Sequence, residues 1–176
     1  MYKRQENDFL VILDHQLGKY TVAEAITEML PYLKYECVHL AIDPEWHTTR
    51  PAEELGYVTG EQINTAQVLI QQYLEDNGIS GKKILVVHQF NQAMIRGREE
   101  VHPFERVDLI HDDDGFGSPS VKRGEYAANA AAENLPLKGI KLFFERPWRD
   151  WGYDNPLMTP EEVLALKPTP VLIIYQ

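Results

Sequence analysis

The stretch His39-Leu-Ala-Ile-Asp-Pro-Glu-Trp46 decides the fold, because it has the pattern of a buried strand that ends abruptly in two carboxylates. Alternate side chains of an extended chain point to opposite faces, so Val38, Leu40 and Ile42 share one face, while His39, Ala41 and Asp43 lie on the other. Glu45 joins Asp43 on that face if the extension continues. Pro44 has no N–H to give to a sheet, so pairing should stop there and leave the acids at the carboxyl edge of the strand.

The same pattern recurs along the chain, as short apolar runs that finish on polar or charged residues. The expected strands are 9–14, 37–43, 83–89, 107–112, 139–145 and 170–176. Helical stripes lie between them, the longest over about 60–76 and about 120–134. Apolar strands that alternate with helices indicate a parallel sheet with both faces covered.

Two α/β architectures fit this alternation, an open doubly wound sheet and most of a TIM-type (β/α)8 barrel. Polar groups gathered at the carboxyl ends of successive strands favour the barrel. A complete barrel usually needs about 250 residues, and this chain has 176. The prediction is therefore an incomplete barrel of six parallel strands, the third to the eighth. Residues 1–7 are expected to be a non-native or disordered leader typical of metagenomic fragments, and 8–176 a single, N-terminally truncated domain.

The composition of the chain argues against several classes of binding partner and of binding site. The net charge of −10 argues against nucleic acid or an anionic membrane as the main partner. No apolar run approaches the length of a membrane span, and the single cysteine, Cys37, excludes an internal disulfide or a thiolate-rich metal site. No glycine-rich phosphate loop follows a strand, so no cofactor is predicted. The sequence specifies neither a protein partner nor a compartment; an extracytoplasmic location would follow if the full-length protein carried a signal or lipoprotein leader.

Several stretches in order resemble an uncharacterised bacterial family of (β/α)-barrel proteins, whose members are often labelled hypothetical protein or lipoprotein. The stretches that carry this resemblance are 40–46, 59–64, 86–90, 114–117, 141–143 and 174–176. It covers roughly residues 8–176 and implies the barrel fold and the truncation. The resemblance implies no reaction.

Asp43-x-Glu45 is the strongest signal for chemistry. Two carboxyls that face one cavity push one pKa up, which gives a protonated acid beside an ionised carboxylate, as glycoside cleavage needs. An Asp-x-Glu at the end of a fourth barrel strand resembles retaining chitinases, although the longer acidic motif of chitinases is absent. We expect Glu45 to be the proton donor, with Asp43 or Glu145 as its ionised partner. The competing interpretation makes Asp43 a turn cap and Glu145 the partner of a nearby arginine.

The remaining candidates are polar, charged or aromatic residues at or just after strand ends, which could bind a carbohydrate or another small polar substrate. They are Asp14, Trp46, His88, Gln89, Asp112, Asp114, Lys141 and Gln176. Lys141 is expected to pair with Asp112 or Asp114 across the barrel. Asp113 should point away from them as a solvated or loop-capping charge.

Two other classes of function compete with the glycosidase hypothesis. A metal-dependent amidohydrolase would use His88 and His111 on neighbouring strands, although His111 has the opposite parity to Asp112 and no metal ligand set is predicted. A non-catalytic carbohydrate-binding barrel would keep the fold without the reaction.

Overall fold

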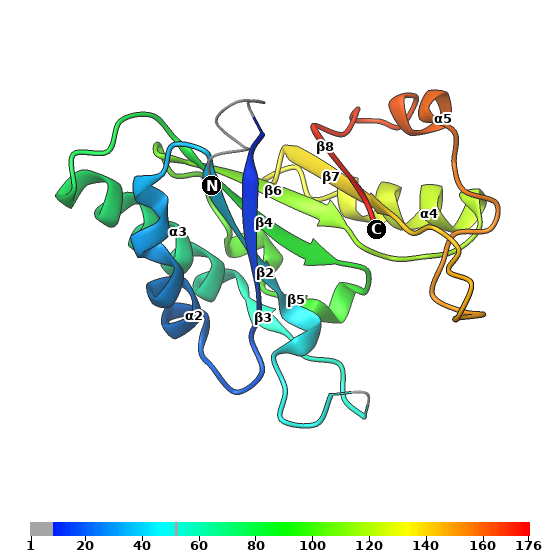
Figure 1. Cartoon of the computed structure of the whole chain (residues 1–176), viewed down its shortest axis with the longest axis horizontal. Coiled ribbons are helices and arrows are strands. Elements are labelled where there is room, and N and C mark those ends of the chain that lie inside the picture. The colour runs from blue at the N-terminus through cyan, green and yellow to red at the C-terminus, as the bar shows by residue number, and fades with distance from the viewer. Residues whose placement is uncertain (1–8, 52) are drawn as a thin grey trace.

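A computed structural model describes residues 9–51 and 53–176 of the chain. Its centre is a six-stranded, all-parallel sheet in the order β1-β2-β4-β6-β7-β8, curled into a half-barrel (Figure 1). Each strand pairs with the next long strand along the chain, so every crossover steps in the same direction. This order excludes the doubly wound alternative, in which the strand order reverses within the sheet.

The elements follow one another as strand, crossover and strand. The six strands of the main sheet are β1 (Val11–Gln16), β2 (Val38–Asp43), β4 (Lys83–Gln89), β6 (Val107–Asp113), β7 (Leu137–Leu142) and β8 (Leu172–Tyr175). The helices are α2 (Val22–Met29), α3 (Gly60–Asp76), α4 (Pro119–Ala130) and α5 (Pro160–Leu164). Short 3₁₀ turns are η1 (Leu30–Lys34), η2 (Pro44–Trp46), η3 (Gln92–Met94) and η4 (Arg98–Glu100), and β3 (Val58–Thr59) pairs with β5 (Ile95–Arg96).

Local chemistry sets the helix starts. Thr21, Thr59 and Thr159 each cap a helix through a capping box. The threonine side-chain oxygen accepts a hydrogen bond from the backbone N–H of the third helical residue, whose side chain accepts one from the backbone N–H of the threonine. The helix that follows Thr59 ends at Asn77, and Gly78 takes the left-handed conformation that glycine adopts without strain.

All four helices cover one face of the sheet, which we call the outer face. Leu40 and Leu85 pack there in the large apolar core with α2 and α3, which lie side by side in Figure 1. Ile140 packs in a second core with Tyr126 of α4 and Val163 of α5. The helices lie on the same face because all crossovers step in one direction along the sheet and parallel crossovers have one preferred hand.

The opposite, inner face is apolar in the middle of the sheet and charged at its carboxyl edge. Ala41, Val86 and Ile110 form its buried apolar layer. Two residues further along the same strands come Asp43, His88 and Asp112. The alternation of side chains and the strand register therefore place Asp43, His88 and Asp112 together on the inner face, at the carboxyl edge of the sheet.

The strand positions were predicted well in the centre of the sheet and less well at its edges. The strand Lys83–Gln89 has the predicted ends, but β1 continues to Gln16, beyond the predicted end at residue 14. The strand β7 ends at Leu142 instead of residue 145, so Glu145 lies in the loop that follows. The predicted leader, 1–7, lies outside the described residues, within which no helix is long and apolar enough to cross a membrane.

Candidate functional site

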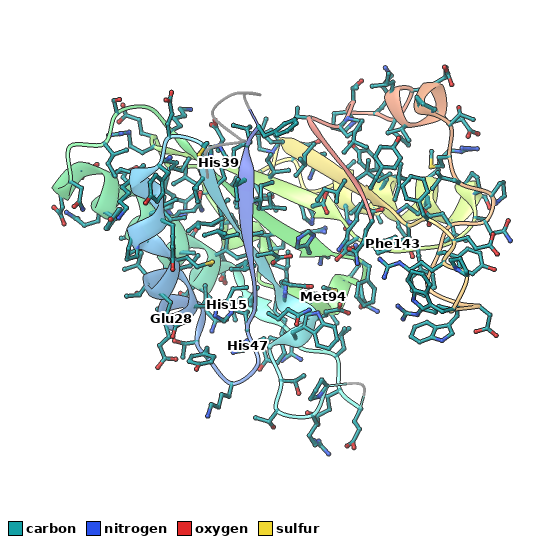
Figure 2. All side chains as sticks on the ribbon, viewed as in Figure 1. His15, Glu28, His39, His47, Met94 and Phe143 are labelled. Carbon is teal, nitrogen blue, oxygen red and sulfur yellow. The ribbon has the colours of Figure 1, made fainter. Side chains whose placement is uncertain are left out.

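The candidate site lies on the inner face at the carboxyl edge of the sheet. Figure 2 shows His39 near the amino ends of the strands and, on the opposite side of the view, His47, Met94 and Phe143, which follow β2, β4 and β7. Seven side chains at this edge form what we call the inner-face cluster: Asp14, Asp43, Glu45, His88, Asp112, Asp114 and Lys141.

His88 is the centre of the cluster and is only 3% exposed. Its Nδ1 lies 2.9 Å from Asp112 Oδ2 and 3.6 Å from Asp114 Oδ2, and its Nε2 lies 3.4 Å from Asp14 Oδ2. Burial opposes protonation of the ring, but hydrogen bonds to Asp112 and Asp14 and the negative charges of Asp112 and Asp114 raise the pKa of His88 well above its ordinary value. His88 is therefore an imidazolium that holds together Asp14 of β1, Asp112 of β6 and Asp114, which follows β6.

Lys141 is the second cation of the cluster. Its Nζ lies 3.1 Å from Asp114 Oδ1, an ion pair whose angles do not meet those of a hydrogen bond. This contact confirms the expectation that Lys141 pairs with Asp112 or Asp114 across the sheet. The cluster therefore contains two cations and five carboxyl groups, of which Asp14, Asp112 and Asp114 pair with a cation. Asp43 and Glu45 have no direct cationic partner in the described part of the chain.

Asp43 and Asp14 have opposite electrostatic surroundings. Burial, and then the nearby charges of Asp114, Glu45 and Asp14, raise the pKa of Asp43 to about 7, although His88 opposes this shift. Asp43 is 5% exposed and its Oδ1 has no hydrogen-bond partner. For Asp14, partial burial raises the pKa, but the hydrogen bond and charge of His88 outweigh it and leave the pKa below its usual value. One aspartate therefore holds a proton near neutral pH while its neighbour is ionised.

The pKa of Glu45 is subject to opposing influences. Burial and the charge of Asp114 raise its pKa, whereas Lys141, His88 and a hydrogen bond from the Trp46 side chain lower it. It follows Asp43 in the 3₁₀ turn η2, which begins at Pro44. The extension that would have placed Glu45 on the same strand face as Asp43 does not continue, because η2 begins at Pro44, but the charge of Glu45 still raises the pKa of Asp43.

Asp112 is fixed by the close approach of β7. Its side chain is fully buried, and a Cβ on Gly139 would stand 2.3 Å from its Oδ1. Gly139 is the register partner of Asp112. A glycine is therefore required at this position for Asp112 to reach His88.

Gln89 and His111 do not belong to the inner-face cluster. Both point to the outer face, where Gln89 Oε1 lies 2.6 Å from His111 Nε2 and accepts a bond of 3.2 Å from Arg98. Lys138 Nζ lies 3.2 Å from His111 Nδ1. Burial and the charge of Lys138 lower the pKa of His111 to about 3, so the ring is neutral. The structure thus separates Gln89 from the other predicted substrate-binding residues.

Asp113 shares this outer-face network and is not solvated, contrary to the prediction. It is fully buried, with Oδ2 3.3 Å from Lys122 Nζ and Oδ1 accepting a 2.9 Å bond from Asn129. Lys122 also donates to the backbone carbonyls of Gly115 and Lys141. The network fastens α4 to the sheet, because a buried carboxylate needs a paired cation.

Glu145 and Gln176 lie at the periphery. Both are exposed, and Glu145 forms no ion pair with Arg146 or Arg149 in the described residues. The backbone of Gln176 bonds with Leu142 and Phe144. Neither side chain is brought into contact with the inner-face cluster, so the predicted pairing of Glu145 with Glu45 is not formed.

Trp46 lines a hollow of about 300 Å³ beside the cluster. The other lining residues are Glu45, Pro51, Glu53, Glu54 and Leu55. No sequence pattern predicts this hollow, because it depends on how the described residues after β2 pack together. Gly139 was missed too, although a glycine inside an apolar strand signals close approach of a neighbour.

The chain matches no protein-family model and no curated protein sequence. Within residues 9–51 and 53–176, no group of three or more His, Cys, Asp or Glu side chains has the arrangement to hold a metal ion. The chemistry of the site therefore follows from its geometry. A cluster of carboxyls in unequal protonation states surrounds one imidazolium.

Proposed function

We propose that the inner-face cluster hydrolyses a glycosidic bond, with Asp43 as the proton donor and Asp14 as its ionised partner. The observation that carries this proposal is the contrast between these two aspartates on neighbouring strands. Pairs of carboxyls whose surroundings push their pKa values apart are the mark of an acid and a base or nucleophile.

The spacing of the pair suits this reaction. Asp14 is the register partner of Ala41, so it lies diagonally from Asp43 across the parallel pair β1–β2. Strand separation and rise place the two Cα atoms roughly 8 Å apart. Side chains that project to the same face from Cα atoms at this spacing can bring their carboxyl groups within the range of about 5–9.5 Å that separates the acid and base carboxyls of glycosidases.

The other residues of the cluster support the two reacting carboxyls. His88 bonds to Asp14 and keeps it ionised, while Asp112 behind the ring fixes its orientation. Asp14 is 41% exposed, so substrate and water can reach it. The sequence favoured Glu45 as donor; the stronger burial of Asp43 and its unpartnered Oδ1 favour Asp43 instead.

We further propose that the curled sheet is part of a TIM-type barrel. The sequential strand order and the polar carboxyl edge both support it, since barrel enzymes place their sites at that edge. The amidohydrolase alternative receives less support, because His88 and His111 project from opposite faces of the sheet.

The test is release of reducing sugar from a panel of polysaccharides and aryl glycosides by the purified chain. Asp43→Asn should lower the rate on any active substrate about 10²–10⁴-fold, the usual value of one proton-transfer group. Asp108→Asn is the matched control, because Asp108 lies on the inner face at the opposite end of β6 and pairs with Lys82.

Three results would contradict the proposal. Asp43→Asn could retain full activity, or no glycan could be cleaved although sugars bind, as in a carbohydrate-binding barrel. Loss of activity with a chelator, restored by zinc, would favour the metal-dependent class.

A further inference from the structure

The loop after β7 is closed at its base by a buried carboxylate. The two side-chain oxygens of Asp154 accept hydrogen bonds from the backbone N–H groups of Gly117 at 2.8 Å and Phe143 at 2.9 Å. The N–H of Asp154 donates in return to the Phe143 carbonyl at 2.9 Å. Residues 144–153 are therefore a loop whose ends are held together, a kind of loop that is frequently functional. Figure 1 shows this segment, in orange, extending past the C-terminus of the chain.

This loop holds two tryptophan rings in the solvent. Trp148 is 78% exposed and Trp151 is 61% exposed. The guanidinium of Arg149 lies over the Trp151 ring, 3.5 Å from its centroid. Gly152 has a φ of 76°, and a Cβ there would stand 3.2 Å from Arg149 Cζ, so the glycine makes room for this stacking. Large apolar rings that a tied loop keeps out of the core mark a binding surface.

A series of ring contacts joins the inner-face cluster to the base of this loop. Lys141 Nζ, which belongs to the cluster, lies 5.2 Å from the centroid of the Phe143 ring. Phe143 packs edge to face against the exposed Phe116, with ring centroids 6.2 Å apart and planes at 79°. Gly117, the residue after Phe116, donates to Asp154. The exposed rings are therefore continuous with the candidate site.

The charged side chains among the rings identify the kind of ligand. Glu145 and Asp150 are balanced by Arg146 and Arg149, so they carry no net charge. Rings interrupted by charges do not make the charge-depleted core of a protein interface, and a surface without net positive charge does not suit an anionic membrane or nucleic acid. A sugar unit suits this mixture. Its C–H groups form an apolar face that can lie on an indole, and its hydroxyls can hydrogen-bond to the flanking guanidinium and carboxylate groups.

We propose that Phe116, Trp148 and Trp151 bind sugar units of a linear, neutral glycan that runs outward from the inner-face cluster. This inference rests on the proposed glycosidase function and names its substrate class, a chain of β-1,4-linked pyranoses. Equatorial substituents and linkages keep such a chain extended and leave the ring C–H groups on two flat faces. Units beyond the cleaved bond can therefore lie on rings outside the cluster.

The experiment is an NMR titration of the full chain with the hexamer and the dimer of β-1,4-linked glucose and, separately, of β-1,4-linked N-acetylglucosamine. The chain has three tryptophans, so single substitutions assign its three indole N–H resonances. We expect one of the two hexamers to shift the resonances of Trp148 and Trp151. That hexamer should bind at least about tenfold more tightly than its dimer, because only the longer chain reaches from the cluster to the loop.

Two variants and a control test the role of the rings. Trp148→Ala and Trp151→Ala should each weaken binding of the hexamer about tenfold and leave the weaker binding of the dimer unchanged. Tyr32→Ala is the matched control, because it removes an exposed ring from η1, which precedes the amino end of β2, and it should change neither affinity. Thermal melting of each variant shows that it is folded, as expected for replacement of exposed side chains.

Three outcomes would overturn the inference. These are no binding of either hexamer, equal affinity for hexamer and dimer, and unchanged hexamer binding in both tryptophan variants. Loss of self-association in those variants with unchanged hexamer binding would identify the loop as a protein contact instead. Binding and hydrolysis are read separately. Length-dependent binding without turnover would contradict only the glycosidase proposal, whereas turnover of the dimer and hexamer at equal rates, unchanged in the tryptophan variants, would contradict only this inference.

Discussion

Asp14 and Asp43 are the same residue type at the same edge of the sheet, and they differ only in their surroundings. Asp14 meets the imidazolium of His88 at 3.4 Å and is partly exposed. Asp43 is buried, and its Oδ1 meets no donor. Unequal solvation and pairing, and not residue identity, therefore lower the pKa of one carboxyl and raise the pKa of the other.

Asp43 should cost the protein stability at neutral and alkaline pH. Its folded pKa of about 7 lies above the ordinary value of 3.8, so stability falls as pH rises between about 4 and 7 and then levels off. Asp43→Asn removes this penalty and should raise the free energy of unfolding at about pH 8 by about 1–4 kcal/mol, while activity is lost. Denaturant titration at about pH 4 and 8 measures the effect.

The control for this prediction is Asp108→Asn, since Asp108 is 42% exposed and pairs with Lys82. It should change stability by well under about 1 kcal/mol at either pH. An Asp43→Asn protein that is less stable than the parent at pH 8 would contradict the prediction.

His88→Gln should be strongly destabilising at neutral pH, because it leaves Asp14, Asp112 and Asp114 without their shared cation. Loss of one partner from a buried charge group costs about 3–5 kcal/mol. The folded pKa of His88 is raised, so its contribution is fully present below the unfolded value of 6.5 and is lost only as pH rises through the folded pKa. Below about pH 4.5 the orphaned acids can take up protons, and the cost should shrink.

Unfolding in urea at about pH 4.5 and 7 tests this expectation, with His102→Gln on an exposed loop as the control. Equal costs of His88→Gln at the two pH values would show that His88 contributes by packing and not by charge.

At the scale of elements, β6 and β7 meet at a point where only a glycine fits. Gly139→Ala puts a Cβ 2.3 Å from Asp112 Oδ1, and overpacking of this kind costs about 1–3 kcal/mol. It should also displace Asp112 from His88. Gly124→Ala is the matched control, because a Cβ there meets nothing within 4 Å.

Gly124 lies in α4, where alanine is the better helix former by about 1 kcal/mol. Gly124→Ala should therefore be neutral or stabilising. Thermal melting of both variants measures the difference in stability. A Gly139→Ala protein as stable as the Gly124→Ala protein would show that β6 and β7 accommodate the added Cβ without loss of stability, which would contradict the prediction.

The elements that sequence patterns predicted best are those whose signals are local. The helical stripe over about 60–76 matches α3, which a capping box starts at Thr59, and the apolar run of β4 gave both of its ends. The strand β7 was misplaced because Lys138 looks like a surface residue, although it is buried and donates to the carbonyls of Asn129 and Ala132. The pairing of β3 with β5 depends on contacts between distant segments and left no periodic signal.

The candidate site was predictable to the same extent. The polar strand ends proposed from the sequence include Asp14, Asp43, His88 and Asp112, which strand register and parity bring to one face. The same parity, applied to Gln89, would have excluded it. Glu145 was misplaced with the end of β7, and the hollow beside Trp46 could not be predicted, because it follows from tertiary contacts.

At the scale of the whole molecule, β1 and β8 are the two outermost strands of the sheet formed by residues 9–51 and 53–176. Apolar side chains are exposed there, including Phe9 and Leu10 at 63% and Val171 at 60%. Unprotected edges of this kind pair with other chains. We therefore expect the 176-residue chain to self-associate with rising concentration, as measured by light scattering.

Val171→Lys should reduce this association, because a lysine at a sheet edge opposes pairing. Val68→Lys, at an exposed position of α3, is the control for added charge and should have less effect. A parent chain that stays monomeric at every concentration would contradict the prediction.

The central claim, that Asp43 holds a proton next to an ionised Asp14, is tested most directly by carboxyl ¹³C NMR titration of the aspartates. Asp43→Asn and Asp14→Asn spectra assign the two resonances. We expect the resonance that disappears in Asp43→Asn to have a midpoint near pH 7, as the resonance of Asp113 also should, while the Asp14 resonance titrates below its ordinary value of 3.8. Titration of both carboxyls near about pH 4, as for ordinary solvated aspartates, would contradict it.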